Sequence, residues 1–424
     1  FQAEDGIRDA DVTGVQTCAL PICAVGSITI KGLTLDGNDA NQPGNASTAN
    51  PIWAKDVDHL SVESVRFKDS IVTRGGGNNT ACIRAYYPAQ KVEVENCDFN
   101  TDVTRHIESS CEELHVDDTY HINVHERSIS LDSLDKNNRI TQRAFISGVE
   151  MDIGPNGSNT GSHIAGHGLD TDTVGSESVT PTGNPIEEWV FKDATLRGAK
   201  RSGIAIRDPS SADSRIEISG GYISGPDNYG VLIFNADNRM TEIENVDVTV
   251  EDVTIEDTGL NGILVKNVSE CTVQDNECTG DIISGDYITT FASRANTVDM
   301  TGCDRSPTGG IGVQANVDNG ESKGDTVINP VNNGFSIKSE NAIVNDWTVI
   351  DLSEGRDGVR VESADVIVRD GVAKSVTSGT AGRHGVFYTN TSGAVAMGNV
   401  GHDLSAATVN LYNTTGDNTD NFAR

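Results

Sequence analysis

The feature that most constrains the fold is a short phrase that recurs along the second half of the chain, a glycine followed by alternating apolar and polar residues. Strong copies begin at Gly203, Gly230, Gly262, Gly310, Gly334, Gly358 and Gly385, and a weaker copy begins at Gly285. Successive glycines are separated by 27, 32, 23, 25, 24, 24 and 27 residues. Alternation with a period of two predicts a strand with one buried face, and a repeat of about 25 residues predicts a solenoid.

Most of these phrases are followed by a second short β-branched run and then a third, joined by turns rich in Gly, Asn, Asp and Ser. No stretch shows a sustained helical stripe of apolar residues, and the leucine-dominated consensus of leucine-rich repeats is absent. We therefore predict an all-β fold, a single-stranded right-handed parallel β-helix in which each coil has three strands and three turns.

From roughly Gly26 onwards, this pattern resembles the pectate-lyase-like superfamily of β-helix proteins. The superfamily includes lyases, hydrolases, tail spikes and catalytically silent members. The resemblance therefore implies a fold and leaves the activity to be argued from a site.

The beginning of the chain has a different character. Residues 1–22 resemble a translated sequencing-library adapter, with QAEDGIRD as one arm and VTGVQTCALPI as the other. We expect residues 1–22 to be an artefact, residues 23–389 to form the β-helix domain, and residues 390–424 to form a C-terminal cap or tail. On this interpretation any signal segment is lost from the sequence.

The composition limits the possible partners. The chain has 63 acidic and 31 basic residues, which gives a formal net charge of -32. Repulsion from this charge argues against nucleic acid or an anionic membrane as a partner. The acidic excess is typical of halophilic proteins, whose charges are screened by salt, and a calcium-dependent secreted protein is the alternative. No apolar run is long enough to span a bilayer. We expect a secreted or cell-surface protein.

Three related phrases, beginning at Gly148, Gly168 and Gly203, predict a strip of charged side chains. If their apolar residues point inward, the outward residues are Glu150, Asp152, Asp170, Asp172 and Arg207. Neighbouring strands lie about 4.8 Å apart, so these groups would share one surface. The following coils would add Phe234 and Lys266 to the same surface.

Clustered carboxylates repel one another and favour a bound cation, and calcium prefers such oxygen ligands. The predicted metal ligands are Glu150, Asp152, Asp170 and Asp172. In pectate lyases, carboxylates on one parallel sheet hold calcium against an acidic sugar, and an arginine removes a proton. The resemblance implies that Arg207 takes this role with Asp170 and Asp172 beside it, while Phe234 and Lys266 bind substrate. The alternative is that the carboxylates are ordinary solvated surface.

A second resemblance overlaps the first. Gly166-His167-Gly168, followed by Gly175-Ser176 and by the phrase ending at Arg207, is similar to polygalacturonase-type hydrolases. His167 matches the motif histidine, which implies a catalytic role, and Arg207 stands in place of a lysine. The Asp-Asp pair that this family needs one coil earlier is replaced by Ile146 and Ser147.

Our hypothesis is a carbohydrate-active β-helix protein that cleaves an acidic polysaccharide by lyase- or glycosidase-like chemistry. The alternative is a non-catalytic β-helix that binds glycans as a surface adhesin, a periplasmic repeat protein or a viral tail component. In both cases the partner is a polysaccharide or a cell-surface glycan. The sequence leaves open whether the chain is an enzyme and whether it binds calcium.

Overall fold

The structure, a computed structural model, describes residues 20–36, 51–68, 80–86, 89–101, 103–124, 127–131, 141–154, 161–166, 186–207, 214–234, 246–266, 268–279, 283–300, 313–352, 355–375, 383–389, 391–405, 408–412, 416–419 and 421–423. All regular elements in these residues are strands, and no helix among them could cross a membrane. The chain divides into two units, residues 1–173 with 179–205 and residues 174–178 with 206–424.

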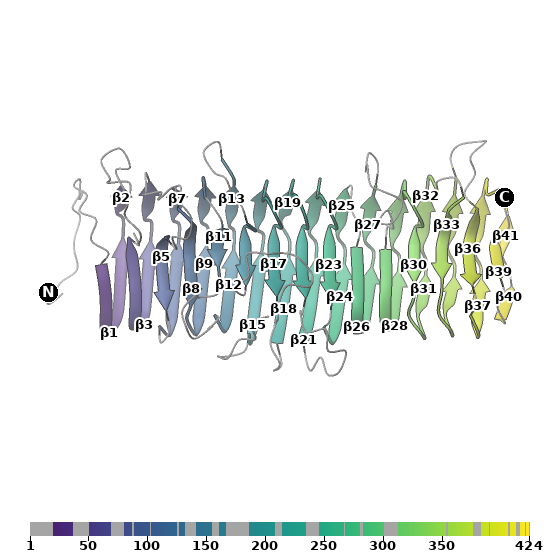
Figure 1. The fold of residues 1–424 in the computed structure, drawn as a ribbon, viewed down its shortest axis with the longest axis horizontal. Helices are drawn as coiled ribbons and strands as arrows, with labels where there is room; N and C mark the ends of the chain where they lie inside the picture. Colours follow the sequence, from purple (N-terminus) through teal and green to yellow (C-terminus); the bar gives the residue numbers. More distant parts are fainter. Residues whose placement is uncertain are drawn as a thin grey trace. The chain divides into compact units, whose positions relative to one another are not determined.

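In unit 1, each coil contributes three strands that pair in parallel with the equivalent strands of neighbouring coils (Figure 1). We call these the first, second and third rows. The first row contains β5 (Ala81–Tyr86), β8 (Arg105–Ser110), β11 (Arg127–Ser130) and β14 (Ile164–Gly166). The second row contains β6 (Lys91–Glu95), β9 (Glu113–Asp117), β12 (Arg143–Ser147) and β15 (Glu188–Lys192). The third row contains β2 (Thr34–Asp36), β4 (Arg66–Lys68), β7 (Asp98–Asn100), β10 (Tyr120–Ile122), β13 (Glu150–Asp152) and β16 (Thr195–Arg197). The long strands β1 (Leu20–Lys31) and β3 (Ile52–Glu63) run through the first and second rows.

Unit 2 repeats this plan, and the boundary between the units falls within β17 (Ile204–Arg207). Its first row contains β20 (Val231–Phe234), β23 (Ile263–Lys266), β30 (Phe335–Ile337), β33 (Asp357–Val361), β36 (His384–Thr389) and β39 (Val409–Tyr412). Its second row contains β18 (Ser214–Ser219), β21 (Val246–Glu251), β24 (Glu270–Gln274), β31 (Ile343–Asn345), β34 (Ile367–Arg369), β37 (Ala394–Met397) and β40 (Gly416–Thr419). Its third row contains β19 (Tyr222–Ser224), β22 (Thr254–Glu256), β25 (Glu277–Thr279), β27 (Thr297–Asp299), β29 (Thr326–Ile328), β32 (Thr348–Ile350), β35 (Val372–Lys374), β38 (Val400–His402) and β41 (Phe422–Ala423). β26 (Ile283–Arg294) and β28 (Val313–Lys323) run through the first two rows.

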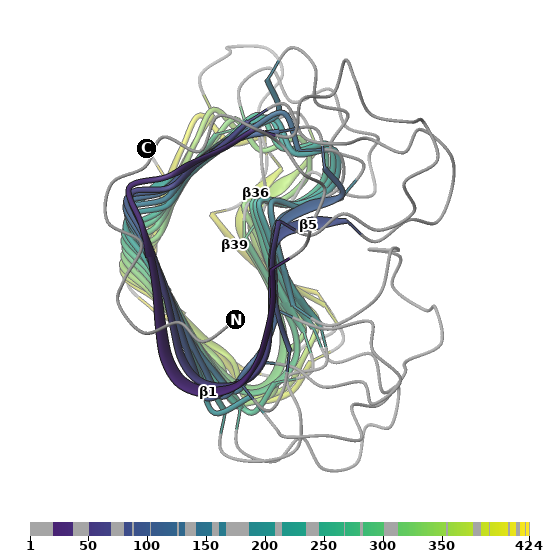
Figure 2. The same cartoon turned by 90° about the vertical axis from the view of Figure 1, so that its left-hand side faces the viewer.

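The predicted fold is confirmed: each unit is a right-handed parallel β-helix with three strands in a typical coil, and strands of one row superpose in the axial view of Figure 2. Two strand groups lie beyond the predicted domain limits. β1 begins at Leu20, and β37 to β41, which begin at Ala394, continue the parallel pairing in the segment after residue 389, where we expected a cap or tail.

The recurring glycine has a steric cause. A Cβ placed at Gly230 would lie 2.6 Å from the carbonyl oxygen of Gly262 in the next coil. The same approach recurs at Gly358, where a Cβ would lie 2.6 Å from the oxygen of Gly385. Only glycine leaves room for this contact between neighbouring backbones, which explains why it recurs at or directly before the start of first-row strands in unit 2.

A second local rule explains the turns between the second and third rows. A single residue there has a positive φ in most coils, and this conformation favours Gly, Asn and Asp. The non-glycine residues include Ser64, Asn96, Asp118, Asp193, Asp252, Asp275, Ala295, Asp346 and Asp370. The glycines include Gly148, Gly324 and Gly398. These turns account for much of the Asn and Asp that separates the apolar runs.

Residues that alternate inward form the core of each unit. In unit 1, the Phe67 and Phe99 rings stack at 4.7 Å, and His121 continues the stack at 4.6 Å. In unit 2, the buried side chains of Asn276, Asn296 and Asp325 form a ladder in which each amide donates to the next side-chain oxygen at 3.0 Å. Such ladders satisfy polar groups that burial would otherwise leave unpaired.

Candidate functional site

Glu150 and Asp152 do not lie in the same row of strands as Arg207, contrary to the prediction. Glu150 and Asp152 lie on β13 in the third row, where their partners in the next coil are Thr195 and Arg197. The phrase that ends at Arg207 instead begins beside β14 in the first row, where the Ile164 amide donates to the Gly203 carbonyl at 3.0 Å. The glycine-led pattern therefore occurs in strands of two different rows. Two phrases with similar sequences can for this reason lie on different faces of the β-helix.

The remaining predicted residues are placed only in part. His167, Asp170 and Asp172 lie outside the described residues, and so does the side chain of Arg207. Phe234 and Lys266 are register partners on β20 and β23, as the sequence predicted. Lys266 is half-buried, and the Phe234 side chain also lies outside the described part. Their roles stay predictions.

Calcium does not fit the part of the predicted site that the structure describes. Arg197 Nη1 lies 2.6 Å from Glu150 Oε1, so this carboxylate already has a cationic partner. Asp152 Oδ1 accepts a hydrogen bond from the Gly154 amide at 2.9 Å. No group of three or more His, Cys, Asp or Glu side chains that could hold a metal occurs among the described residues. Calcium at Asp170 and Asp172 stays a prediction.

A different surface gathers aromatic and cationic side chains in unit 1. On β3, Ile52 and Ala54 are buried, so the alternation directs Trp53 and Lys55 outward. Trp53 is 39% exposed, and Lys55 is also exposed.

The next coil continues this surface on β5. Trp53 is in register with Arg84, and Lys55 is in register with Tyr86. Arg84 is in turn in register with Glu108 on β8. We call Trp53, Lys55, Arg84, Tyr86 and Glu108 the Trp53 patch. Because register partners lie on adjacent strands, these five side chains occupy neighbouring outward positions of the first row.

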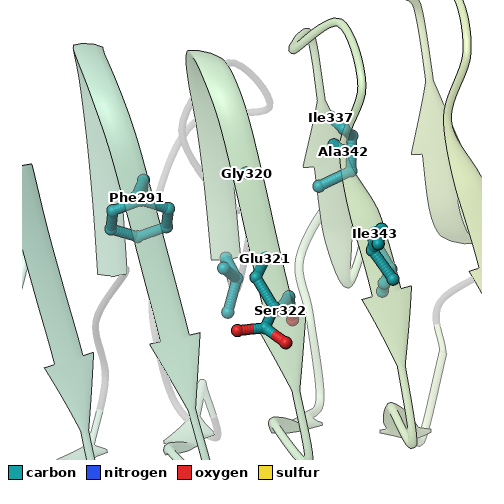
Figure 3. Close-up of a pocket in the computed structure, with 9 residues that line it drawn as sticks. Phe291, Gly320, Glu321, Ser322, Ile337, Ala342 and Ile343 are labelled. Carbon is teal, nitrogen blue, oxygen red and sulfur yellow. The ribbon is translucent and has the colours of Figure 1, made fainter.

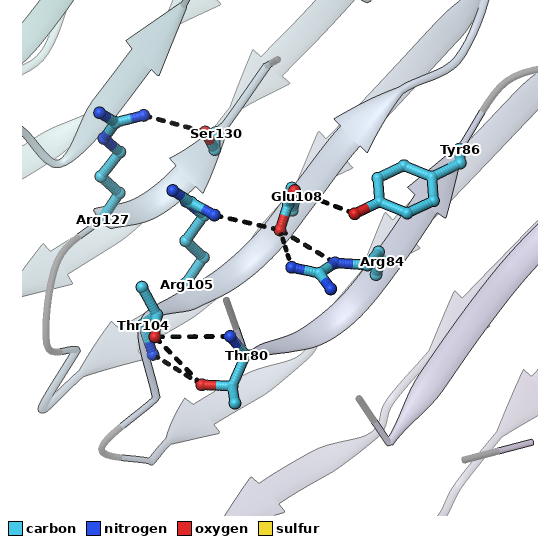
Figure 4. Close-up of polar contacts among 8 residues, drawn as sticks. All are labelled: Thr80, Arg84, Tyr86, Thr104, Arg105, Glu108, Arg127 and Ser130. Atoms are coloured by element: carbon cyan, nitrogen blue, oxygen red, sulfur yellow. Dashed lines mark hydrogen bonds and ion pairs between the residues drawn. The ribbon is translucent and has the colours of Figure 1, made fainter. Parts of the chain in front are cut away.

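Glu108 is the centre of a buried polar network (Figure 4). Its Oε2 accepts from Arg84 Nε at 3.0 Å and Nη2 at 2.5 Å, and from Arg105 Nη1 at 3.3 Å. Glu108 is 0% exposed, which means that these charge-assisted bonds form away from water. The network fixes the guanidinium of Arg84 beside Trp53.

Tyr86 connects the network to the surface. Its hydroxyl donates to Glu108 Oε1 at 3.3 Å, and the Arg84 guanidinium carbon lies 5.4 Å from the centre of its ring. Tyr86 is only half-buried, whereas Arg84 and Glu108 are buried. The patch therefore combines an aromatic platform, an exposed ammonium group, a fixed guanidinium and a tyrosine hydroxyl.

Two histidines of unit 1, His106 and His121, belong to the core. His106 Nε2 lies 3.1 Å from the Thr101 carbonyl oxygen, so this nitrogen carries the proton, and its Nδ1 accepts from His121 Nδ1 at 3.1 Å. His121 Nε2 then accepts from the Thr119 hydroxyl at 2.9 Å. Burial lowers the pKa of His106 to about 4 and lowers that of His121 well below its usual value. Both rings are neutral structural groups.

A small hollow in unit 2 offers no alternative site (Figure 3). It has a volume of about 10 Å³ and lies beside Phe291, Gly320, Ile337, Ala342 and Ile343. The space arises because Gly320, the register partner of Phe291, has no side chain. A volume of this size holds about one water molecule and no sugar ring.

The sequence analysis did not predict the Trp53 patch, because it aligned the strands on their leading glycines. The phrases Ile52-Trp53-Ala54-Lys55, Ile83-Arg84-Ala85-Tyr86 and Ile107-Glu108-Ser109-Ser110 have the same alternation without a leading glycine. Aligning them on their isoleucines would have placed their outward residues side by side, as the structure does.

Comparisons with known proteins add the following. No protein-family model matches the chain, and no curated protein matches it. Among solved structures, the chain is similar to the Streptococcus pneumoniae surface protein and adhesin PfbA, with 10% identity over 94% of this chain and 91% of that chain and a TM-score of 0.39. It is also similar to the periplasmic alginate epimerase AlgG, with 10% identity, coverage of 93% and 85% and a TM-score of 0.36. The A-module of the Azotobacter vinelandii mannuronan C-5 epimerase AlgE6 gives 12% identity, coverage of 87% and 91% and a TM-score of 0.32. Similarity of this degree says nothing about the activity of this chain.

Proposed function

We propose that the protein acts on an acidic polysaccharide outside the cytoplasm and binds it at the Trp53 patch. The observation that carries this proposal is the exposed Trp53 beside Lys55 and Arg84, in a chain of net charge -32. An aromatic face suits the apolar face of a sugar ring, and cationic groups suit its carboxylates. In so acidic a protein, a local cationic patch selects an anionic ligand against a repulsive background.

The chemistry that this patch supports best is removal of a proton next to a sugar carboxylate, followed by elimination. Lys55 would neutralise the carboxylate of the sugar, and the buried Arg84 would hold the Tyr86 ring in place. Tyr86 as the phenolate would take the proton from the carbon next to that carboxylate and, as the hydroxyl, return it to the glycosidic oxygen when the C–O bond breaks. Hydrolysis is less well supported because it requires two carboxyl groups on either side of the scissile bond. The carboxylate of the patch, Glu108, is fully buried and bound by two guanidinium groups.

A second candidate function is glycan binding without cleavage. The burial of Glu108 and Arg84 favours this function, because neither side chain can reach a bound sugar to take part in chemistry. The most exposed side chains of the patch are Trp53 and Lys55, which suit binding. A patch of this composition is complete as a binding surface without any proton transfer.

The two functions are separated by assaying polyuronates for an unsaturated product by ultraviolet absorbance, with and without a calcium chelator. Tyr86→Phe should lower the turnover at least about 100-fold while binding is retained, since a positioned proton-transfer group contributes about 10² to 10⁴. Trp53→Ala should weaken binding. Tyr120→Phe is the matched control, since Tyr120 is 38% exposed on the third row. Product formation by Tyr86→Phe at the wild-type rate would eliminate the proton-transfer role, and binding without any product would leave the second function.

A further inference from the structure

Unit 2 has a cationic surface of its own in the first row, on β33 and β36. Arg360 and Phe387 are register partners on these strands. The guanidinium carbon of Arg360 lies 5.7 Å from the centre of the Phe387 ring, and that of Arg383 lies 4.6 Å from the same centre. One aromatic ring therefore supports two guanidinium groups, an arrangement that restricts both side chains.

Each guanidinium is also anchored on one side by a carboxylate. Arg360 Nε donates to Glu362 Oε1 at 2.7 Å. Arg383 donates to the buried Asp357 through Nε at 3.1 Å and Nη2 at 2.7 Å, and His384 Nδ1 lies 2.9 Å from Asp357 Oδ1. These bonds leave three nitrogens, both Nη atoms of Arg360 and Nη1 of Arg383, without a hydrogen-bond partner in the described part of the chain.

The charges of this surface favour an anion. Lys338 Nζ lies 4.0 Å from Glu362, so three cations share two carboxylates. The side chains of Arg360, Arg383 and Lys338 are 35%, 39% and 46% exposed, so their free edges face solvent. Guanidinium groups fixed in position bind carboxylates with two parallel hydrogen bonds at little cost in conformational entropy.

We propose that Arg360 and Arg383 form a second, non-catalytic binding site for a carboxylate of an acidic polysaccharide. The choice of ligand rests on the proposed function, whereas the site itself rests on the geometry around Phe387. Asp357 lies beneath it fully buried and occupied by Arg383 and His384, so the site holds the polymer and does no chemistry. Two sites on one chain would raise the affinity for long polymers above that for short oligosaccharides.

The test measures binding of polygalacturonate of about 100 sugar units by affinity electrophoresis and calorimetry, in a background carrying Trp53→Ala and Lys55→Gln. Adding Arg360→Gln should weaken the remaining binding about 10-fold, because it removes charge-assisted hydrogen bonds. Arg360→Lys keeps the charge without the planar fork and should give an intermediate loss. Arg294→Gln is the matched control: Arg294 is 50% exposed and pairs with Glu321 at 2.7 Å, and no aromatic ring among the described residues is recorded in contact with its guanidinium.

The outcomes separate this site from the proposed function. Equal binding by the Arg360→Gln and Arg294→Gln variants, or equal binding of neutral dextran, would overturn the second site. If Arg360→Gln weakens binding but Trp53→Ala and Tyr86→Phe change neither binding nor product formation, the second site stands and the Trp53 patch fails. Should Arg360→Gln unfold the protein, the comparison of Arg360→Lys with Arg294→Lys decides the question.

Discussion

Acidification should unfold unit 1 through its buried histidines. Burial lowers the pKa of both His106 and His163 to about 4, below the value of 6.5 expected in the unfolded chain. The unfolded chain therefore binds protons at pH values where the folded chain does not, and the free energy of unfolding falls as the pH falls from 6.5 toward 4. A shift of this size is worth about 3 kcal/mol for each histidine when the interval is crossed completely.

The hydrogen bonds explain why protonation is incompatible with the fold. His163 Nε2 donates to the Arg197 carbonyl at 2.7 Å, so its Nδ1 accepts from the Ser128 hydroxyl at 3.3 Å. His106 and His121 face each other through their Nδ1 atoms at 3.1 Å, so protonating the acceptor, His106 Nδ1, would place two donors in contact. Asp152 partly offsets the effect at His163 by favouring its charged form.

The measurement is urea unfolding at a series of pH values, followed by circular dichroism. Between pH 7 and pH 5, we expect the free energy of unfolding to fall by about 4 kcal/mol from His106 and His163 together. His163→Gln supplies the comparison, because its amide can donate to the Arg197 carbonyl but cannot titrate. This variant should lose the part of the pH dependence that His163 contributes, about 2 kcal/mol between pH 7 and pH 5. Imidazole signals of His106 and His163 that titrate near 6.5 in the folded protein would refute the reasoning. An unchanged pH dependence in His163→Gln would also refute it.

Two further substitutions test the fold. Gly358→Ala should lower the stability by about 1–3 kcal/mol, because the new Cβ meets the Gly385 oxygen at 2.6 Å, whereas Gly26→Ala, whose Cβ would lie 3.8 Å from its nearest neighbour, should be neutral or stabilising in thermal unfolding. Asp325→Asn should raise the thermal midpoint at neutral pH, because burial raises the pKa of Asp325 and an amide would complete the ladder with Asn296. The folded carboxyl holds its proton to higher pH than the unfolded one, so Asp325 adds stability as the pH falls, and this contribution should be absent in the variant.

The sequence by itself determined the fold and the repeat. The glycine at the start of many first-row strands and the Asp or Asn at the left-handed turns are visible in the sequence because each is required by local backbone geometry. Alternation likewise identified most inward residues. The neighbouring positions of Phe234 and Lys266 followed directly, since both stand at the same place after a leading glycine.

Only the tertiary structure decided which side chains share a surface. The phrases at Gly148 and Gly203 look alike, yet a different number of residues precedes each within its coil, and this number places them in different rows. Glu150 therefore meets Arg197 instead of Arg207. Trp53, Arg84 and Glu108 come together because register joins residues 24 to 31 positions apart, a spacing that varies with the length of every intervening turn. Row and register depend on the lengths of loops whose sequences carry no periodic signal, whereas the repeat depends on local backbone geometry.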